Sequence, residues 1–245
     1  MTDRDIASEV LDCLMAKADE RQAANLSRFF KTSPGQYGHG DRFLGIRVPE
    51  TRAIVKEAKK GMTLTAAIEL IHSEWHEVRL AGFLSLIELY RKAKKQKDED
   101  AQKSIVDTYI ELIPYGNNWD LVDLVSQYIL GDRLLTHPDE RGILYRLAES
   151  SNLWENRVSI VATFAMIRAC SFDDTLRLAE IHMHHPHDLM HKATGWMLRE
   201  IGKRDESVLI AFLDRYATSL PRTALRYSLE KLKPCLRHHY MTLKQ

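Results

Sequence analysis

Apolar residues recur along the chain every three to four positions, which is the spacing of amphipathic helices. Ile6, Val10 and Leu14 form one such stripe near the N-terminus. Further stripes span residues 54–58, 80–87, 121–130, 158–167 and 198–201. Strand signals are nearly missing, since no Asn-Gly or Asp-Gly turn separates two alternating apolar runs. We therefore predict an all-α protein built from about a dozen helices of about 10–18 residues.

Several predicted helices have recognisable starts. Pro49 with Glu50 behind it suits a first helical turn. The pairs Asn152–Glu155 and Ser171–Asp174 resemble capping boxes, in which a side chain accepts from the backbone three residues on. Prolines at positions 138, 221 and 234 are expected to open further helices.

A weak repeat runs through these helices. Residues 77–80 align with 155–158, which places Arg79 opposite Arg157, and residues 190–201 align with 221–232. A period in the thirties predicts a curved right-handed superhelical solenoid of HEAT/armadillo-like helix pairs, with an irregular helical bundle as the alternative. We expect a single domain over residues 1–245 with a concave groove. Arg79, Arg157 and Lys192 would line that groove, unless they simply belong to solvated helix faces.

Composition and charge narrow the class of protein. The chain is 44% hydrophobic and 28% charged, which fits a globular protein with a core. Its formal net charge is +1, but the basic residues are clustered. Residues 28–60 hold eight basic and three acidic side chains, and residues 186–245 hold eleven and six. Two such blocks predict a basic stripe on one face, suited to a polyanion.

Cysteine usage and hydropathy indicate the compartment. Cys13, Cys170 and Cys235 are odd in number, and no two form a CxxC pair, so we expect them in the core of a protein from a reducing compartment. No apolar run approaches the ~20 residues of a membrane span, and the first ten residues lack the apolar stretch of a signal peptide. We therefore predict a cytoplasmic protein that makes no membrane contact.

The glycine-rich loop over residues 33–47 is a candidate anion site. It holds four glycines together with Gln36, Tyr37, Arg42 and Arg47. Glycine amides beside arginines suit phosphate contacts. The alternative is a long turn between two helices, and both descriptions can hold. Motifs for nucleotide phosphates, dinucleotides and serine hydrolases do not occur in the sequence.

Five histidines crowd between His182 and His191, and the segment from His187 to His191 is a variant of the HExxH zinc motif. Its aspartate is shorter than the usual general-base glutamate, and no third ligand stands at a recognisable spacing. Pro186 and Asp188 also suit an ordinary helix start. We expect no metal site there.

The segment NNWDLVD (117–123) carries the most suggestive chemistry. Trp119 and Asp123 are four residues apart and therefore stand side by side on a helix. The indole could pack on a sugar or base, while the acid could face positive charge or activate a water. Trp154, Arg157 and Trp196 offer further indoles and a cation. The alternative is that the tryptophans are core residues and that Asp123 caps a helix or pairs with an arginine.

Three segments resemble the AlkD family of DNA alkylation repair glycosylases. They are FFKTSPGQYGHGDRFLGIRVPETR (29–52), NNWDLVD (117–123) and LWENRVSIVATFAMIR (153–168), and the later helix with Trp196 is similar too. The resemblance covers residues 3–233. It implies HEAT-like repeats and a monofunctional enzyme that hydrolyses the N-glycosidic bond of cationic alkylated purines, such as 3-methyladenine and 7-methylguanine, without metal or cofactor.

By the same resemblance, the catalytic aspartate falls on Asp123, with Trp119, Arg157 and Trp196 completing the site. The expected partner is double-stranded DNA with alkylated bases, bound by a monomer that needs no protein partner. We predict further DNA contacts at Gln36, Tyr37, Arg42, Arg47, Arg79, Trp154 and Lys192.

Two other functions stay open. A non-catalytic HEAT-repeat protein that binds DNA of a particular shape would share most of these residues, although a central carboxylate gains nothing in binding a polyanion. A protein–protein scaffold would bind in a manner insensitive to salt, unlike phosphate contacts. The resemblance also implies that the lesion is read without enclosing the base, whereas glycosylases in general flip it. Loss of excision with every increase in adduct size would argue for an enclosing pocket.

Overall fold

The computed structural model describes residues 3–243, and its regular structure is helical throughout that range, which confirms the all-α prediction. The nearest approach to sheet pairing there is an isolated bridge between Arg42 and Trp75. None of the helices between residues 3 and 243 combines the length and apolar character that crossing a bilayer requires. The chain divides into two compact units, Met1–Val125 and Ser126–Gln245.

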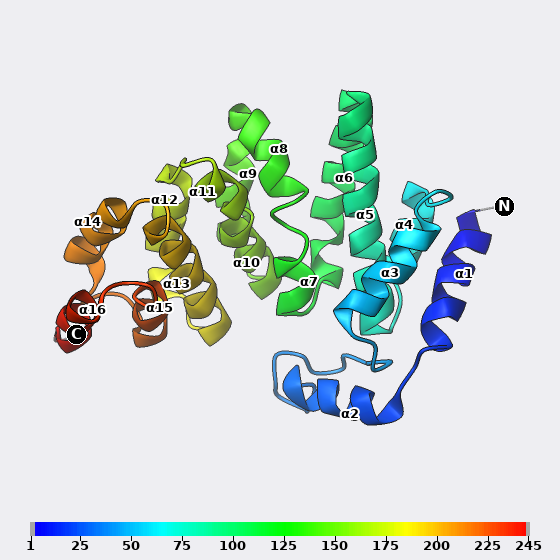
Figure 1. Ribbon diagram of the computed structural model, residues 1–245, viewed down its shortest axis with the longest axis horizontal. Helices are drawn as coiled ribbons and strands as arrows, with labels where there is room; N and C mark the ends of the chain where they lie inside the picture. Colours follow the sequence, from blue (N-terminus) through cyan, green and yellow to red (C-terminus); the bar gives the residue numbers. More distant parts are fainter. Residues whose placement is uncertain (1–2, 244–245) are drawn as a thin grey trace. The chain divides into compact units, whose positions relative to one another are not determined.

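The first unit is organised around one long helix. Its elements are α1 (Asp3–Met15), α2 (Glu20–Phe29), α3 (Val48–Ala58), α4 (Leu64–Ile71), α5 (His76–Gln96), α6 (Glu99–Leu112), a 3-10 turn (Ile113–Tyr115) and α7 (Trp119–Asp123). Helix α5 packs against α3, α4 and α6 (Figure 1). The predicted stripe over residues 80–87 is buried in it, with Leu80 and Phe83 each 1% exposed.

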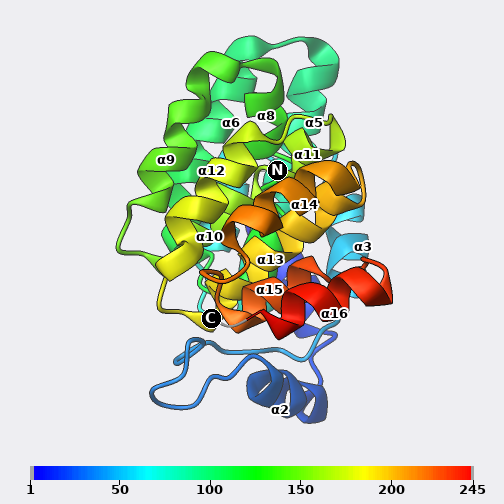
Figure 2. The same cartoon turned by 90° about the vertical axis from the view of Figure 1, so that its left-hand side faces the viewer.

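The second unit is built around α13. Its elements are α8 (Leu130–Thr136), a 3-10 turn (Pro138–Arg141), α9 (Gly142–Ala148), α10 (Leu153–Val161), α11 (Phe164–Arg168), α12 (Asp173–Ile181), a 3-10 turn (His182–His184), α13 (Asp188–Gly202), α14 (Glu206–Tyr216), α15 (Arg222–Ser228) and α16 (Pro234–Thr242). Helix α13 packs against α14 and α15, as Figure 2 shows. Gly195 permits the close contact, because a Cβ there would collide with the carbonyl oxygen of Ala224.

Most predicted helix starts are confirmed. The Asn152 side chain accepts from the backbone of Trp154 and Glu155, and helices begin at or next to Pro49, Pro221 and Pro234. The Ser171 start is wrong. Helix α12 begins at Asp173 without a side-chain cap, and the Asp174 carboxylate instead accepts from Arg141 and Tyr145.

Two predicted helices are interrupted. The stretch 121–130 is divided by turns after α7, where the backbone N–H of Val125 bonds three residues back and that of Gly131 five residues back. The stretch 158–167 is divided at Thr163, whose hydroxyl and N–H both bond to the Ile160 carbonyl. Apolar periodicity continues through such turns because they keep a nearly helical rotation.

The cysteine prediction is wrong. Cys13, Cys170 and Cys235 are all exposed. Cys13 lies on the solvent side of the helix whose other side buries Val10 and Leu14. Cys170 follows α11 with a positive φ of 58°, at a turn that leads back to solvent.

Candidate active site

The short helix α7 presents two of the predicted site residues. Asn118 caps it, and its side chain accepts from the Trp119 backbone N–H at 2.9 Å. Leu121 and Val122 are buried, at 1% and 2% exposure, whereas Trp119 and Asp123 are half-buried. The helix therefore divides as the spacing predicts, with an apolar side in the core and the indole and carboxylate together on the other.

A mainly apolar cavity of about 460 Å³ lies against this face. Its volume is within the range of small-molecule sites. Trp119, Asp123 and Asp120 from α7 line it, together with Phe29, Phe30, Phe43, Leu26, Ile46, Arg47, Val48, Pro49, His76, Glu77, Leu80 and Leu124. A carboxylate in such surroundings interacts strongly with any positive charge that enters, because little water screens it.

Aromatic rings are stacked in a column along the cavity wall. Trp119 stacks on Phe30 with centroids 5.2 Å apart, Phe30 on Phe43 at 5.1 Å, and Phe43 on the His76 imidazole at 4.4 Å. Phe29 adds an edge contact to Trp119 at 6.0 Å and is 63% exposed.

A buried ionic network lies behind the column. Within it, His76 bridges two carboxylates, with Nδ1 2.8 Å from Asp41 and Nε2 2.9 Å from Asp120. The Arg79 guanidinium donates to Asp41 at 2.5 Å and to Asn117 at 3.0 Å. The Asn118 amide donates to Asp41 at 3.2 Å. Two cations thus face two carboxylates in the core of the first unit.

The network shifts the pKa values of His76 and Asp41. Burial lowers the pKa of His76, but the charges and hydrogen bonds of Asp120 and Asp41 outweigh it and raise that pKa to about 9. Burial likewise raises the pKa of Asp41, yet His76, Arg79 and Asn118 together hold it below the ordinary value. At neutral pH, His76 is therefore an imidazolium and Asp41 a carboxylate.

Glu77 organises the glycine-rich loop from the same helix. Its carboxylate accepts three backbone N–H groups, from Leu44 at 2.8 Å, Gly45 at 2.9 Å and Ile46 at 3.1 Å. Gly45 has a φ of +91°, and a Cβ there would collide with the carbonyl oxygen of Asp19. The amides that the sequence suggested for phosphate are thus already engaged internally at Gly45, and also at Gly38, which donates to the Lys31 carbonyl.

The other predicted DNA contacts of the first unit differ in how exposed their side chains are. Arg79 is 5% exposed and held by the network, so its guanidinium has no free surface to offer a phosphate. Arg42 is exposed, pairs with Glu74 and lies 4.3 Å over the Trp75 ring. Arg47 is also exposed, at the cavity, and so is Gln36 in the loop. Tyr37 is half-buried there.

The second unit holds the remaining predicted site residues. Arg157 is 4% exposed, and its Nη1 donates to the Leu189 carbonyl at 2.5 Å. Trp154 is 7% exposed on the same helix. Trp196 is half-buried on α13, with its ring 5.7 Å from Phe164. Lys192 pairs with Asp188 at 2.8 Å.

The histidines between His182 and His191 make structural hydrogen bonds. His187 caps α13 by accepting from the Leu189 N–H, so it lies outside the helix that carries His191. His191 donates to the His185 carbonyl at 2.6 Å, and buried His182 meets the Ser159 hydroxyl at 2.9 Å. Among the residues that the structure describes, no group of three or more His, Cys, Asp or Glu side chains has a metal-binding arrangement.

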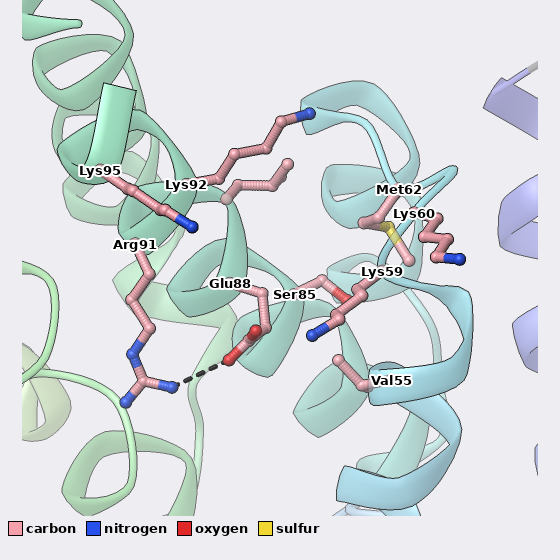
Figure 3. A pocket seen from close by; sticks show the side chains of 10 residues that line it. Val55, Lys59, Lys60, Met62, Ser85, Glu88, Arg91, Lys92 and Lys95 are labelled. Atoms are coloured by element: carbon pink, nitrogen blue, oxygen red, sulfur yellow. Dashed lines mark hydrogen bonds and ion pairs between the residues drawn. The ribbon is translucent and has the colours of Figure 1, made fainter. Parts of the chain in front are cut away.

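A basic cleft runs between α3 and α5 in the first unit. Two adjoining hollows of about 470 and 240 Å³ share Val55, Lys59, Glu88 and Arg91. Figure 3 shows the side chains that line the first of them. Seven cationic side chains line them: Arg52, Lys56, Lys59, Lys60, Arg91, Lys92 and Lys95. Glu88 is the one acid in the lining, and it pairs with Arg91 at 2.8 Å. We call this surface the α3–α5 basic cleft.

Sequence reasoning missed several of these residues. The adjacent Phe29 and Phe30 at a helix end were a usable signal, since a core seldom buries both neighbours. The run of lysines over 92–97 extends the basic block onto α5. His76, Asp41 and Asp120 gave no local signal, because their partners lie 35 and 44 residues away.

A family model and a solved structure that match this chain are both described as DNA alkylation repair enzymes. The family model described as DNA alkylation repair enzyme matches residues 10–232. Among solved structures, the chain is similar to one described as "Predicted DNA alkylation repair enzyme from Enterococcus faecalis". The two are 18% identical, the match covers 89% of this chain and 97% of that one, and the TM-score is 0.70, so the likeness shows a shared fold. No curated protein matches the sequence.

Proposed function

The chain belongs to the family of DNA alkylation repair enzymes, and from this premise we propose that it is a monofunctional DNA glycosylase of base-excision repair. Its substrates are cationic alkylated purines in duplex DNA, among them 3-methyladenine and 7-methylguanine. It acts as a monomer in the cytoplasm, with neither metal nor cofactor. The observation that carries this function is the pair of Trp119 and Asp123 facing an apolar, aromatic cavity from one short helix.

The chemistry needs a carboxylate in that position. An N3- or N7-alkylated purine carries a positive charge and departs as a neutral base when its bond to C1′ breaks. The sugar then becomes an oxocarbenium ion, which the Asp123 carboxylate stabilises by its charge. Water adds its oxygen to C1′, and Asp123 accepts the proton that the water releases.

The rings around Asp123 hold the sugar. Trp119 is fixed by stacking on Phe30, so its exposed edge and face are held in place before DNA binds. The face of an indole attracts the weakly positive C–H groups of a deoxyribose. In the second unit, we propose Trp196 as a further ring against the sugar, the role that the family resemblance implies. Arg157 is 4% exposed and donates to the Leu189 carbonyl, so it is left out of the proposed phosphate contacts, as Arg79 is.

We propose that the DNA backbone is bound by basic side chains outside the cavity. The α3–α5 basic cleft offers cations with few acids, and it lacks the aromatic rings on which single strands stack. Arg42, Arg47 and Lys192 are further exposed or half-exposed cations. Gln36 and Tyr37 stay in the proposed contact set from the sequence prediction, whereas the buried Arg79 and Trp154 are left out of it.

We also propose that the helices form HEAT-like repeats. Arg79 and Arg157, which the weak repeat aligns, both lie near the start of a helix and are buried at 5% and 4%. Each donates to a backbone carbonyl, Arg79 to Ser73 and Arg157 to Leu189. The carbonyls differ in place, six residues before Arg79 and 32 residues after Arg157, so the proposal rests on the recurrence of a buried arginine near a helix start.

Release of 7-methylguanine from methylated duplex DNA tests the enzyme, with the wild type compared with Asp123→Asn. We expect the excision rate to fall on the order of 10²–10³-fold in the variant, since the transition state no longer has a carboxylate facing its positive charge. DNA affinity should change little. Asp107→Asn, an exposed acid of α6 paired with Lys103, is the matched control and should excise normally.

The second candidate function is a non-catalytic protein that binds DNA of a particular shape. The α3–α5 basic cleft favours this function, because cationic side chains bind the phosphates of DNA without any catalytic group. Binding of methylated DNA without base release by the wild type would select this function over the glycosylase.

A further inference from the structure

Helix α7 cannot hold its own position. It has five residues, and a helix of about one turn is unstable in isolation because its first hydrogen bonds do not repay the ordering of the backbone. The placement of Trp119 and Asp123 must therefore come from contacts that other elements make with α7.

Those contacts are concentrated at its start. Asn117 accepts from Arg79, Asn118 donates to Asp41, and Asp120 bonds to His76. The segment 117–123 thus holds three anchors to the ionic network, two core residues, and Trp119 and Asp123, which line the cavity.

His76 is the group that joins the two sides of this network. Its Nδ1 faces Asp41 from the loop before α3, and its Nε2 faces Asp120 from α7. A neutral imidazole carries one N–H and can donate to one carboxylate, whereas the imidazolium donates to both. Being 2% exposed and stacked on Phe43, His76 has little water that could replace a broken hydrogen bond.

The charged groups around His76 are mostly carboxylates. Asp41 comes from the loop, Arg79 and Glu77 from α5, and Asp120 and Asp123 from α7. Glu77 is satisfied by its three backbone donors. His76 pairs with Asp41 and Asp120, and Arg79 pairs with Asp41.

We propose that His76 is a positioning residue for the candidate active site, whose imidazolium clamps α7 to the glycine-rich loop and so sets the places of Trp119 and Asp123. This inference rests on the proposed function for its effect on excision, but its structural part does not. Loss of the proton releases one of the two carboxylates, and α7 then shifts with the groups that it carries.

The first test needs no substrate. In the full-length protein, ¹⁵N spectra follow the His76 ring, and the Trp119 indole N–H is assigned by its disappearance in Trp119→Phe. We expect both His76 ring N–H signals at pH 7, and a shared midpoint near pH 9 at which the Trp119 signal moves. A neutral His76 ring at pH 7, or a Trp119 signal that stays fixed across that midpoint, overturns the inference.

Two variants carry the test further. In His76→Gln the pH response of Trp119 should vanish. Asp120→Asn keeps an acceptor but removes one carboxylate, so the His76 midpoint should fall toward its ordinary value of about 6.5. The second variant keeps the inference falsifiable if the first fails to fold, since an unchanged midpoint would refute it.

Single-turnover excision measures the consequence for catalysis. We expect His76→Gln to lose about 10²-fold in rate, the effect of a displaced catalytic group, with DNA affinity changed less than about threefold. The wild type should lose activity above about pH 9, and the variant should lack that limb. Arg133→Gln, which removes a buried cation paired with Glu140 in the second unit, is the control and should keep the wild-type rate and pH limb.

The outcomes separate the two claims. If the wild type excises nothing but Trp119 follows His76, the glycosylase function fails and the clamp stands. If excision in His76→Gln equals that of the wild type at every pH, the positioning role is refuted.

Discussion

Single carboxylates in the first unit act as hubs for segments that are distant in sequence. Glu77 alone satisfies three backbone N–H groups of the loop before α3, and Asp41 receives hydrogen bonds from His76, Arg79 and Asn118. A buried donor left without a partner costs about 1–3 kcal/mol. The order of the glycine-rich loop (33–47), part of which lines the cavity, therefore depends on these two carboxylates.

We expect Glu77→Gln to lower the free energy of unfolding by about 1–3 kcal/mol, because the amide replaces one acceptor oxygen by a donor that faces other donors. Urea unfolding measures the loss. Glu88→Gln on the same helix removes a half-exposed pair with Arg91 and should cost less than about 1 kcal/mol. Equal losses in the two variants would contradict the role given to Glu77.

At the scale of elements, the position of α7 depends on α5. The first residue of α5 is His76, and its fourth is Arg79, so one helical turn supplies both cations of the network. The pKa of His76 is raised in the folded protein, so its contribution to stability is complete below the unfolded value of about 6.5 and is lost as the pH rises through about 9.

We therefore expect the free energy of unfolding of the wild type to decline between about pH 6.5 and pH 9.5, by up to about 3 kcal/mol. His76→Gln should be less stable than the wild type at pH 6.5 and should show a flatter pH dependence. Urea titrations at several pH values measure both curves. A decline of the same size in the variant would assign the effect to other groups.

At the scale of the whole molecule, the formal net charge is close to zero, yet basic side chains are clustered in the α3–α5 basic cleft. Among the residues that the structure describes, Arg52, Lys56, Lys59, Lys60, Lys92 and Lys95 form no ion pair at the α3–α5 basic cleft, although the chain has nearly equal numbers of acids and bases. Such crowding disfavours folding slightly and favours a polyanionic partner.

We expect duplex DNA binding to weaken steeply with salt. In the double variant Lys59→Gln, Lys92→Gln, the slope of log K against log salt should become shallower by about 0.9 for each phosphate that the protein no longer neutralises. Titrations of undamaged duplex over a range of salt concentrations measure the slope. Lys103→Gln, which removes a lysine already paired with Asp107, should leave it unchanged. Affinity that ignores salt in the wild type would favour the protein scaffold instead.

The sequence by itself determined the features that depend on near neighbours. Apolar spacing was enough for an all-α chain, and prolines and Asn152 marked helix starts, because both signals act within a few residues. The four-residue spacing of Trp119 and Asp123 likewise placed them on one helix face, since helix geometry alone dictates it.

Only the tertiary structure decided what those residues meet. The partners of His76 lie 35 and 44 residues away, and Arg79, expected at a surface, is buried against Asp41 at a separation of 38. The exposure of the cysteines and the end of the helix at Asp123 could not be predicted from the sequence either. Burial and ion pairing are fixed by how distant segments pack, and periodicity along the chain carries no record of which segments come together.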